Sequence, residues 1–506
     1  MNRQANKLYL SKSKLISAWQ CPKRLHLEIH NPELADVTAN AEALFATGHQ
    51  VGAIAHQVYG PEDGIEIRYR GDLSIAVRET AELIASGANN PIFEATFQHD
   101  GVLVRVDVLL PVDDGWHAVE VKATTRVKEH HKIDCAIQYW VMRNAGVKIK
   151  SISLSHINNQ FVYQGDGNYS GLLVDEDITE GVLKLVEDVP ALVLEARMAA
   201  GGETPVMPVG AHCNQPYDCQ FYAHCWPVDA EYPVMGLRGS KAKLGAWVEA
   251  GYRDIRDVDV EHITSESQLR IHRVTCSGEP EILDGARREI ESLAYPRYYL
   301  DFETVGPAVP IWRGTRPYEA IAVQWSCHID EGPTDDSPEN LRHEEFLDLS
   351  GAPPMRPLAE RLIECLGQSG PILMYTKYER TVIDELIALF PDLADSLRQI
   401  VHRLVDLHPI VKNNYYHPKM LGSWSIKAVV PAMAPQMSYA NLEGINEGMA
   451  ASVGYLEAID PGISSERKAE LKEQLLRYCQ FDTEAMVEIV RFFSEYRQLT
   501  GKKRDP

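Results

Sequence analysis

Alternation of apolar and polar residues marks two neighbouring segments in the first quarter of the chain, VRVDVLL at 104–110 and AVEVKATT at 118–125. Successive side chains of an extended strand point to opposite faces, so Glu120 and Lys122 share one face while the valines beside them pack behind. The pattern predicts two adjacent strands, with Asp107 of the first strand beside the Glu-Lys pair.

A second informative pattern lies in the last two fifths of the chain. Aromatic and β-branched enrichment in YPRYYLDFETV, residues 295–305, predicts a strand that carries Asp301 and Glu303 on one face. Near the C-terminus, RYCQFDTEAMVEIVRFF has the period of an amphipathic helix, on which Tyr478 and Asp482 stand four residues apart and therefore on one face.

Length and composition indicate a globular protein with several cores. The chain has 506 residues, of which 45% are hydrophobic and 24% charged, and this length predicts two or three domains. We expect an α/β multi-domain fold. No apolar run reaches the roughly 20 residues that span a bilayer, and the polar start MNRQANKLYLSKSK lacks the apolar segment of a signal peptide, so we expect a cytoplasmic protein without a membrane partner.

The net charge of −22 excludes a protein that coats nucleic acid indiscriminately, because bulk electrostatics repel phosphate. Any nucleic-acid site is therefore local. Two basic runs offer one, although either also fits an ordinary solvated surface. The first run comprises Arg3, Lys7, Lys12, Lys14, Lys23 and Arg24, and the second comprises Lys122, Arg126, Lys128 and Lys132 with His130 and His131.

Aromatic and basic residues also interleave between residues 403 and 430, at Tyr415, Tyr416, Trp424 and Lys427. Such interleaving suits a platform for single-stranded nucleic acid. A packed loop over a sheet explains the pattern equally well.

The residue types on the two polar faces suit metal-dependent hydrolysis. Asp107 and Glu120 supply hard oxygen ligands for Mg²⁺ or Mn²⁺, and Lys122 supplies an ammonium that orients water or neutralises charge on a phosphorane. The pair of Asp301 and Glu303 suits a two-metal site. The alternative is an ordinary amphipathic hairpin whose solvent-exposed face is charged and has no catalytic role.

Three of the nine cysteines are evenly spaced, with five residues between neighbours: Cys213, Cys219 and Cys225 in HCNQPYDCQFYAHCW. In a cytosolic chain such thiols favour a metal or cluster over disulfides. A closed site needs a fourth ligand, and Cys21 in SAWQCPKRLHLE is the best candidate. Zinc held by the trio with His212 or His224 is the alternative.

On these residues, positions 1–230 resemble the iron–sulfur RecB-like nucleases of the PD-(D/E)xK superfamily, which include the nucleases of CRISPR adaptation. The resemblance implies a [4Fe–4S] cluster held by Cys21, Cys213, Cys219 and Cys225. It also implies a catalytic set of His49, Asp107, Glu120, Lys122 and, on the following helix DCAIQYWVMRNAG, Gln138. A tyrosine usually follows one turn after the glutamine; here Met142 stands at that position, and Tyr139 lies next to Gln138 instead.

Positions 291–506 resemble the DEDD exonucleases of the ribonuclease-H-like fold. Asp301 and Glu303 match the first motif of that family, and Tyr478 with Asp482 matches the third in its tyrosine variant, which implies that the tyrosine positions the attacking water. The second motif normally supplies an aspartate, where ILMYTKYERTVIDEL offers Glu379. Asp406 is a second candidate, or else a helix cap. The order of parts also resembles an uncharacterised bacterial family in which such a domain follows a RecB-like nuclease.

The sequence thus predicts three segments: a nuclease with a cysteine-bound cluster at 1–230, a helical connector at 231–290 and an exonuclease at 291–506. The expected activity is metal-dependent hydrolysis of DNA, as a 3′-5′ exodeoxyribonuclease acting on single strands or ends, with RNA as a further substrate. The competing hypothesis is a nucleic-acid-binding or scaffold protein with degenerate sites and a structural metal.

Overall fold

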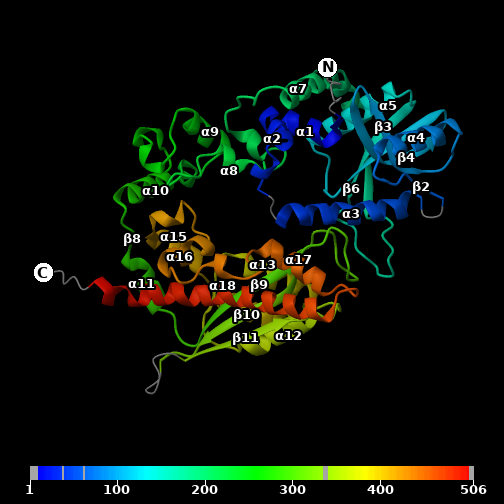
Figure 1. Cartoon of the computed structure of the whole chain (residues 1–506). Helices are drawn as coiled ribbons and strands as arrows, with labels where there is room; N and C mark the ends of the chain where they lie inside the picture. Colours follow the sequence, from blue (N-terminus) through cyan, green and yellow to red (C-terminus); the bar gives the residue numbers. More distant parts are fainter. Residues whose placement is uncertain (1–8, 37–38, 61–62, 334–339, 501–506) are drawn as a thin grey trace. The chain divides into compact units, whose positions relative to one another are not determined.

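The computed structural model describes residues 9–36, 39–60, 63–333 and 340–500 (Figure 1). The chain divides into two compact units. The first comprises Met1–Val228, Ser240–Glu249 and Pro307–Tyr318, and the second comprises Asp229–Gly239, Ala250–Gly306 and Glu319–Pro506. Each unit contains a mixed sheet with helices, so the chain has an α/β multi-domain fold. Residues 231–290, expected to form a connector, are shared between the two units.

A seven-stranded sheet organises the first unit, with the order β2-β3-β4-β5-β6-β7 and with β1 paired to β4 outside this path. The strands are β1 Leu10–Ser11, β2 Ile65–Glu66, β3 Ile92–His99, β4 Val102–Val112, β5 Gly115–Lys122, β6 Ile149–Ile157 and β7 Leu173–Asp177. β3, β4 and β5 are antiparallel neighbours, whereas β5 and β6 are parallel. The two predicted strands are confirmed as β4 and β5, and the second ends at Lys122, three residues before its expected limit.

Helices of the first unit accompany this sheet, several of them packed against its faces. They are α1 Lys12–Gln20, α2 Pro22–His30, α3 Ala39–Tyr59, α4 Leu73–Ala85, α5 Glu129–Asn144, α6 Thr179–Leu185, α7 Val189–Gly201, α8 Tyr222–Cys225 and α9 Lys241–Glu249. Short 3-10 turns are η1 Pro32–Leu34, η2 Val186–Asp188 and η3 Ala211–Asn214. The main core joins α1, α5 and α7 to one sheet face. On the other face α3 packs Ala55 against Val108 and Val119.

The alternation along β5 decides which helix its polar residues meet. Ala118 belongs to the core that contains α5, and Val119 belongs to the core beneath α3. Because side chains alternate between faces, Glu120 and Lys122 project on the side of α5. The helix predicted at DCAIQYWVMRNAG is confirmed within α5 and lies over this face.

The second unit contains a five-stranded sheet with the order β11-β10-β9-β12-β13. Its strands are β9 Arg297–Val305, β10 Ile321–Asp330, β11 Leu341–Leu347, β12 Ile372–Met374 and β13 Leu404–Asp406, and β8 Glu281–Ile282 pairs separately with β14 Tyr415–Tyr416. β10 is antiparallel to β9 and β11, whereas β12 is parallel to β9 and β13, so the sheet is mixed. The strand predicted at 295–305 is β9.

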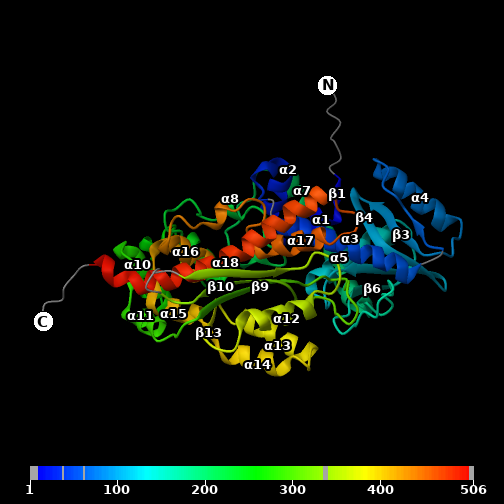
Figure 2. The same cartoon turned by 90° about the horizontal axis from the view of Figure 1, so that it is seen from below.

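Two groups of helices cover this sheet: α17 and α18 lie on one side, and α12, α13 and α14 on the other (Figure 2). The helices are α10 Glu266–Ser277, α11 Asp284–Glu291, α12 Met355–Leu366, α13 Tyr378–Leu389, α14 Ala394–His402, α15 Leu407–Asn414, α16 Ile426–Met433, α17 Gly448–Ala458 and α18 Ser465–Thr500. The 3-10 turns are η4 Val234–Leu237, η5 Ile255–Asp257, η6 Val260–His262, η7 Pro418–Met420 and η8 Tyr439–Asn441. No helix within the described ranges combines the length and apolarity that crossing a lipid bilayer requires.

Hydrogen bonds from β10 to α18 fix the orientation of β9. Gln324 donates to the carbonyl of Leu475, and Ser326 bonds to Thr483. Glu303 lies opposite Gln324 and Asp301 opposite Ser326 in the antiparallel ladder. Directly opposed residues share a face, so both carboxylates point toward α18, the confirmed C-terminal helix.

The aromatic stretch between 403 and 430 is packed, so it is not a stacking platform. Tyr415, Tyr416 and Trp424 are all buried, and the indole N–H of Trp424 donates to the carbonyl of Tyr415. Buried rings offer no face to a base. Of the two interpretations of this stretch, the packed loop is correct.

Candidate functional sites

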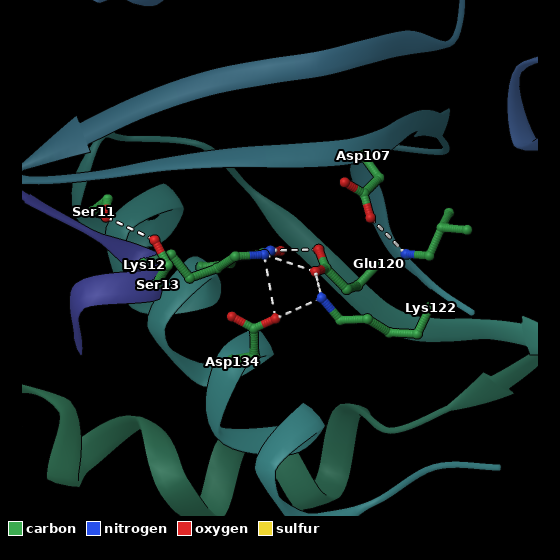
Figure 3. A network of polar contacts seen from close by, with 9 residues as sticks. Ser11, Lys12, Ser13, Asp107, Glu120, Lys122 and Asp134 are labelled. Carbon is green, nitrogen blue, oxygen red and sulfur yellow. Dashed lines mark hydrogen bonds and ion pairs between the residues drawn. The ribbon is translucent and has the colours of Figure 1, made fainter. Parts of the chain in front are cut away.

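The polar face of β5 meets β4, α1 and α5 in a buried network (Figure 3). Glu120, only 1% exposed, accepts from the Gln138 amide at 2.5 Å and from the Lys122 ammonium at 2.5 Å. Asp107 accepts the backbone N–H of Val121 at 2.7 Å, which bends its carboxylate toward β5. The structure therefore brings together Asp107, Glu120, Lys122 and Gln138, from three different elements.

Two residues that the sequence did not assign to this site complete it: Lys12, expected only as part of a basic run, and Asp134. The Lys12 ammonium, from the first turn of α1, lies 2.7 Å from Glu120 Oε1 and 3.3 Å from Asp134 Oδ2. Lys122 contacts the same two oxygens, at 2.5 and 3.0 Å. Lysines and carboxylates thus alternate in a closed ring of four ion pairs, drawn as dashed lines in Figure 3.

The charges of this centre shift its pKa values in opposite directions. Burial by itself raises the pKa of Glu120, but Lys12 and Lys122 outweigh burial and hold that pKa below its ordinary value. Burial and then the negative charge of Glu120 raise the pKa of Asp107 to about 7. Three carboxylates face two ammonium groups, so the centre retains an excess of negative charge that favours a further cation.

The remaining predicted residue of the first site is His49. It is exposed on α3, the helix that packs beneath Val119, and forms no hydrogen bond or ion pair with the residues of the centre. Of the first basic run, Arg3 and Lys7 lie outside the described residues, while Arg24 pairs with Glu28 at 2.8 Å. Of the members of this run that the structure describes, Lys12 enters the centre.

The four predicted cysteines line one pocket of the first unit. Cys21 lies at the junction of α1 and α2, Cys213 lies in η3, and Cys225 ends α8. Burial raises the pKa of Cys21, and the proximity of Cys213 and Cys225 raises it further. Thiolates gathered in this way require a cationic centre to be stable.

The N-terminal helices are tied directly to the segment that carries the other three cysteines. The Gln20 amide donates to the carbonyls of His212 and Tyr217, at 2.8 and 2.7 Å. His212 also lines the pocket, with Nε2 3.8 Å from the sulfur of Cys213, whereas His224 is exposed.

Four carboxylates from three elements meet in the second unit. They are Asp301 and Glu303 of β9, Glu379 of α13 and Asp482 of α18. The negative charges of the other three contribute to raising the pKa of Asp301. In the described part of the chain none of the four forms an ion pair. Oxygen atoms of Asp301 and Glu303 and the sulfur of Cys479 lie within 4.8 Å of one another, a spacing at which one cation reaches all three.

Burial and mutual repulsion disfavour the ionised form of the carboxylates in this second centre. Burial, and then Asp482 and Glu303, raise the pKa of Asp301 well above its ordinary value. Burial raises the pKa of Glu379 to about 8 and that of Asp482 to about 6. Buried carboxylates are normally paired or bound to metal, so this arrangement is suited to divalent cations.

A strained turn presents Glu379 to the centre. Thr376, between β12 and α13, has a φ of 95°, which is rare for a β-branched residue. Its N–H donates to Asp406 at 3.1 Å, and Asp406 also caps α15 through His408. Glu379 is 2% exposed, and its Oε2 has no hydrogen-bond partner among the described residues. Asp406 is therefore a cap that stabilises this turn.

Tyr478 lies over the same centre, where burial, then Asp482 and Glu303, raise its pKa. Two residues outside the predicted set accompany it. The Tyr439 hydroxyl donates to Asp482, and the Lys427 ammonium lies 5.1 Å from the centroid of the Tyr478 ring.

Some of these partners had a signal in the sequence. Cys479 and Asp482 are three apart on α18, and Asp134 and Gln138 are four apart on α5, so each pair shares a helix face with a predicted residue. Tyr439 had no such signal, because it lies in a 3-10 turn far from the motifs.

Parts of this chain are similar to known proteins. Residues 298–425 match a family described as a domain of unknown function, DUF2779. Over 221 residues, or 39% of this chain, the sequence is 24% identical to the uncharacterized protein MG366 of Mycoplasma genitalium. That match spans about a third of the relative's length, 32%. The crystal structure of SSO0001 matches 37% of this chain and 76% of its own, with 17% identity and a TM-score of 0.19.

Proposed function

We propose that this chain is a metal-dependent nuclease with one hydrolytic centre in each unit. The observation that carries the proposal is the convergence of Asp107, Glu120 and Lys122 on one buried face. Asp107 and Glu120 would hold Mg²⁺ or Mn²⁺, which when bound supplies Lewis-acid polarisation of a phosphate and a more acidic water. This combination is what phosphodiester hydrolysis needs.

The protein's own groups have separate tasks in the first centre. The Gln138 amide donates a hydrogen bond that positions Glu120, and the ion pair with Asp134 positions the Lys122 ammonium. The Lys122 ammonium orients the attacking water or neutralises negative charge that develops on the phosphorane. We assign the ligand role to Asp107 and Glu120, since His49 is exposed on α3 and has no hydrogen bond or ion pair to these residues.

A specific observation favours hydrolysis in the second unit as well. Four buried carboxylates share one centre, and the Oε2 of Glu379 lacks a partner among the described residues. Asp301, Glu303, Glu379 and Asp482 would hold divalent cations, and Tyr478 would orient the water. Replacement of the usual aspartate by Glu379 is compatible with this role because Glu379 is presented by the strained turn at Thr376. A 3′-5′ exonuclease acting on single-stranded DNA ends or RNA is the activity that we infer.

The cysteine pocket supports an iron–sulfur cluster better than zinc. A single Zn²⁺ with bonds of about 2.3 Å holds its sulfur ligands roughly 4 Å apart. Within the described residues, no three ligand atoms from the four cysteines and His212 lie within 4.8 Å of one another. A [4Fe–4S] cluster is a larger body that suits the wider spacing, and it would tie α1 and α2 to residues 213–225.

The cluster assignment predicts a brown protein. Anaerobically purified chain should absorb near 400 nm and contain about four irons per chain, as thiolate-bound [4Fe–4S] clusters do. Cys213→Ser should remove most of the iron, whereas Cys276→Ser, at an exposed cysteine outside the pocket, should leave it unchanged. A colourless protein with one zinc per chain would contradict the cluster.

Substrate class is tested with labelled single-stranded DNA, double-stranded DNA and RNA. We expect degradation with Mn²⁺ or Mg²⁺ and none with a chelator. The competing function is a nucleic-acid-binding or scaffold protein. It predicts retention of the labelled strands in a binding assay without any cleavage, in every metal.

A further inference from the structure

Lys12 occupies an unusual place in the first centre. Its ammonium is bound to Glu120, a predicted metal ligand, and to Asp134, with distances of 2.7 and 3.3 Å. Lys122 already pairs with both of these oxygens. The centre thus holds a second lysine with the same partners as the first, contributed by an element remote in sequence.

The surroundings of the Lys12 ammonium consist largely of negative charge. Burial lowers its pKa, but Asp134 and Glu120 outweigh burial and raise the pKa overall, with Asp107 adding to them. The Lys12 side chain is 19% exposed, against 1% for Glu120 and 28% for Lys122, so it lies at the edge of the centre. A long side chain that reaches in from the edge can withdraw without unfolding the core.

A cation placed on a ligand oxygen competes with any other cation for that oxygen. Lys122 lies two residues from Glu120 on β5, whereas Lys12 comes from the start of α1. Both contacts of the Lys12 ammonium are longer than those of Lys122, at 2.7 against 2.5 Å to Glu120 and 3.3 against 3.0 Å to Asp134. Of the two lysines, Lys12 is therefore the one that a divalent cation displaces more readily.

We propose that Lys12 is an exchangeable cation of the first centre: a divalent metal displaces its ammonium from Glu120, and the released ammonium binds a phosphate of the nucleic acid. This inference rests on the proposed function, because it names a role for Lys12 within the same centre. It makes Lys12 a competitor of the metal and a ligand of the substrate.

The competition has a consequence that a merely structural role lacks. Lys12→Met removes a positive charge beside Glu120, so Mn²⁺ should bind at least about tenfold more tightly. The same substitution removes a phosphate ligand, so the KM for single-stranded DNA should rise several-fold. Opposite changes in the two affinities are the expected signature. A residue that only supports the fold would weaken both when replaced.

The experiment uses the full chain with Asp301→Asn as background, which removes the second metal centre. Mn²⁺ binding is followed by electron paramagnetic resonance of free Mn²⁺, and KM by cleavage of labelled single-stranded DNA. Lys12→Arg keeps the charge and should keep the weaker Mn²⁺ affinity. Lys184→Met, at an exposed lysine of α6 that pairs with Glu180, is the matched control and should change neither the Mn²⁺ affinity nor the KM.

The outcomes separate the two proposals. Mn²⁺ binding that Glu120→Gln abolishes shows that the first centre holds metal, and failure of this step overturns the proposed function itself. If that binding is present but Lys12→Met leaves the Mn²⁺ affinity unchanged or weakens it, the exchange role of Lys12 is wrong. Tighter Mn²⁺ binding together with an unchanged KM would likewise overturn the phosphate role.

Discussion

Lys122→Met is expected to reduce metal-dependent DNA cleavage by the first centre at least ~10²-fold, the loss typical when a charged stabilising group is removed from a hydrolytic site. The measurement is made in the Asp301→Asn background, so that the second centre does not contribute. Mn²⁺ binding should persist, because Asp107 and Glu120 remain in place. The effect is large because Lys122 is held 2.5 Å from Glu120 and 3.0 Å from Asp134.

Lys184→Met provides the matched control for this prediction. Lys184 is an exposed lysine of α6, paired with Glu180 at 2.6 Å, and carries the same charge away from the centre. Its replacement should leave the cleavage rate within about twofold, since exposed pairs of this kind contribute little. Equal rates for wild type and Lys122→Met would remove Lys122 from the reaction.

Asp301→Asn is expected to stabilise the metal-free chain and to abolish the stabilisation by metal at the second centre. Removal of one of four buried like charges should raise the melting temperature in chelator at pH 8 by at least about 2 °C. Divalent cations stabilise a folded chain that binds them. Because Asp301→Asn lacks one of the proposed metal ligands, added metal should no longer raise its melting temperature. Asp395→Asn, at an exposed residue of α14 paired with Arg398, is the control. It should change neither the melting temperature in chelator nor the melting temperature with metal.

The pH dependence gives the same prediction a second readout. Folding raises the pKa of Glu379 from 4.5 to about 8 and that of Asp482 from 3.8 to about 6. A carboxyl whose pKa is higher in the folded chain stabilises the folded chain fully when the pH is below its pKa in the unfolded chain. This stabilisation is lost as the pH rises through its pKa in the folded chain. The metal-free melting temperature should therefore fall between about pH 4 and pH 8, and added Mn²⁺ should reverse the fall. A melting temperature independent of pH and metal would contradict the second centre.

Local sequence patterns predicted the position of a site residue where a single strand or helix determines that position. Alternation in β5 placed Glu120 and Lys122 on one face, and helical spacing in α18 placed Tyr478 beside Asp482. The even spacing of three cysteines and the isolated Cys21 predicted a single pocket, and all four line it. For the strand and the helix the geometry of one element decides the outcome, whereas the cysteine pocket also needs α1 and α2 to pack against residues 213–225.

Other features depend on contacts between distant segments, which no local period encodes. Nothing in SKSKL distinguishes Lys12, which enters the centre, from Lys14, which does not, because the choice is made by the docking of α1 on α5. Similarly, interleaved aromatics fit both a platform and a core, and the burial of Tyr415 and Trp424 follows from tertiary packing. The alternation also continues past Lys122, where β5 ends, although Ile157 of β6 still donates its N–H to the carbonyl of Thr124 at 2.8 Å.

The central claim is that two separate centres hydrolyse phosphodiester bonds. The most direct test compares four full-length chains, wild type, Glu120→Gln, Asp301→Asn and the double variant, on labelled single-stranded DNA with Mn²⁺. The account predicts that each single variant retains part of the cleavage and that the double variant retains none, with all four chains equally folded by circular dichroism. Undiminished cleavage by the double variant, or none by the wild type in any divalent metal, would contradict it.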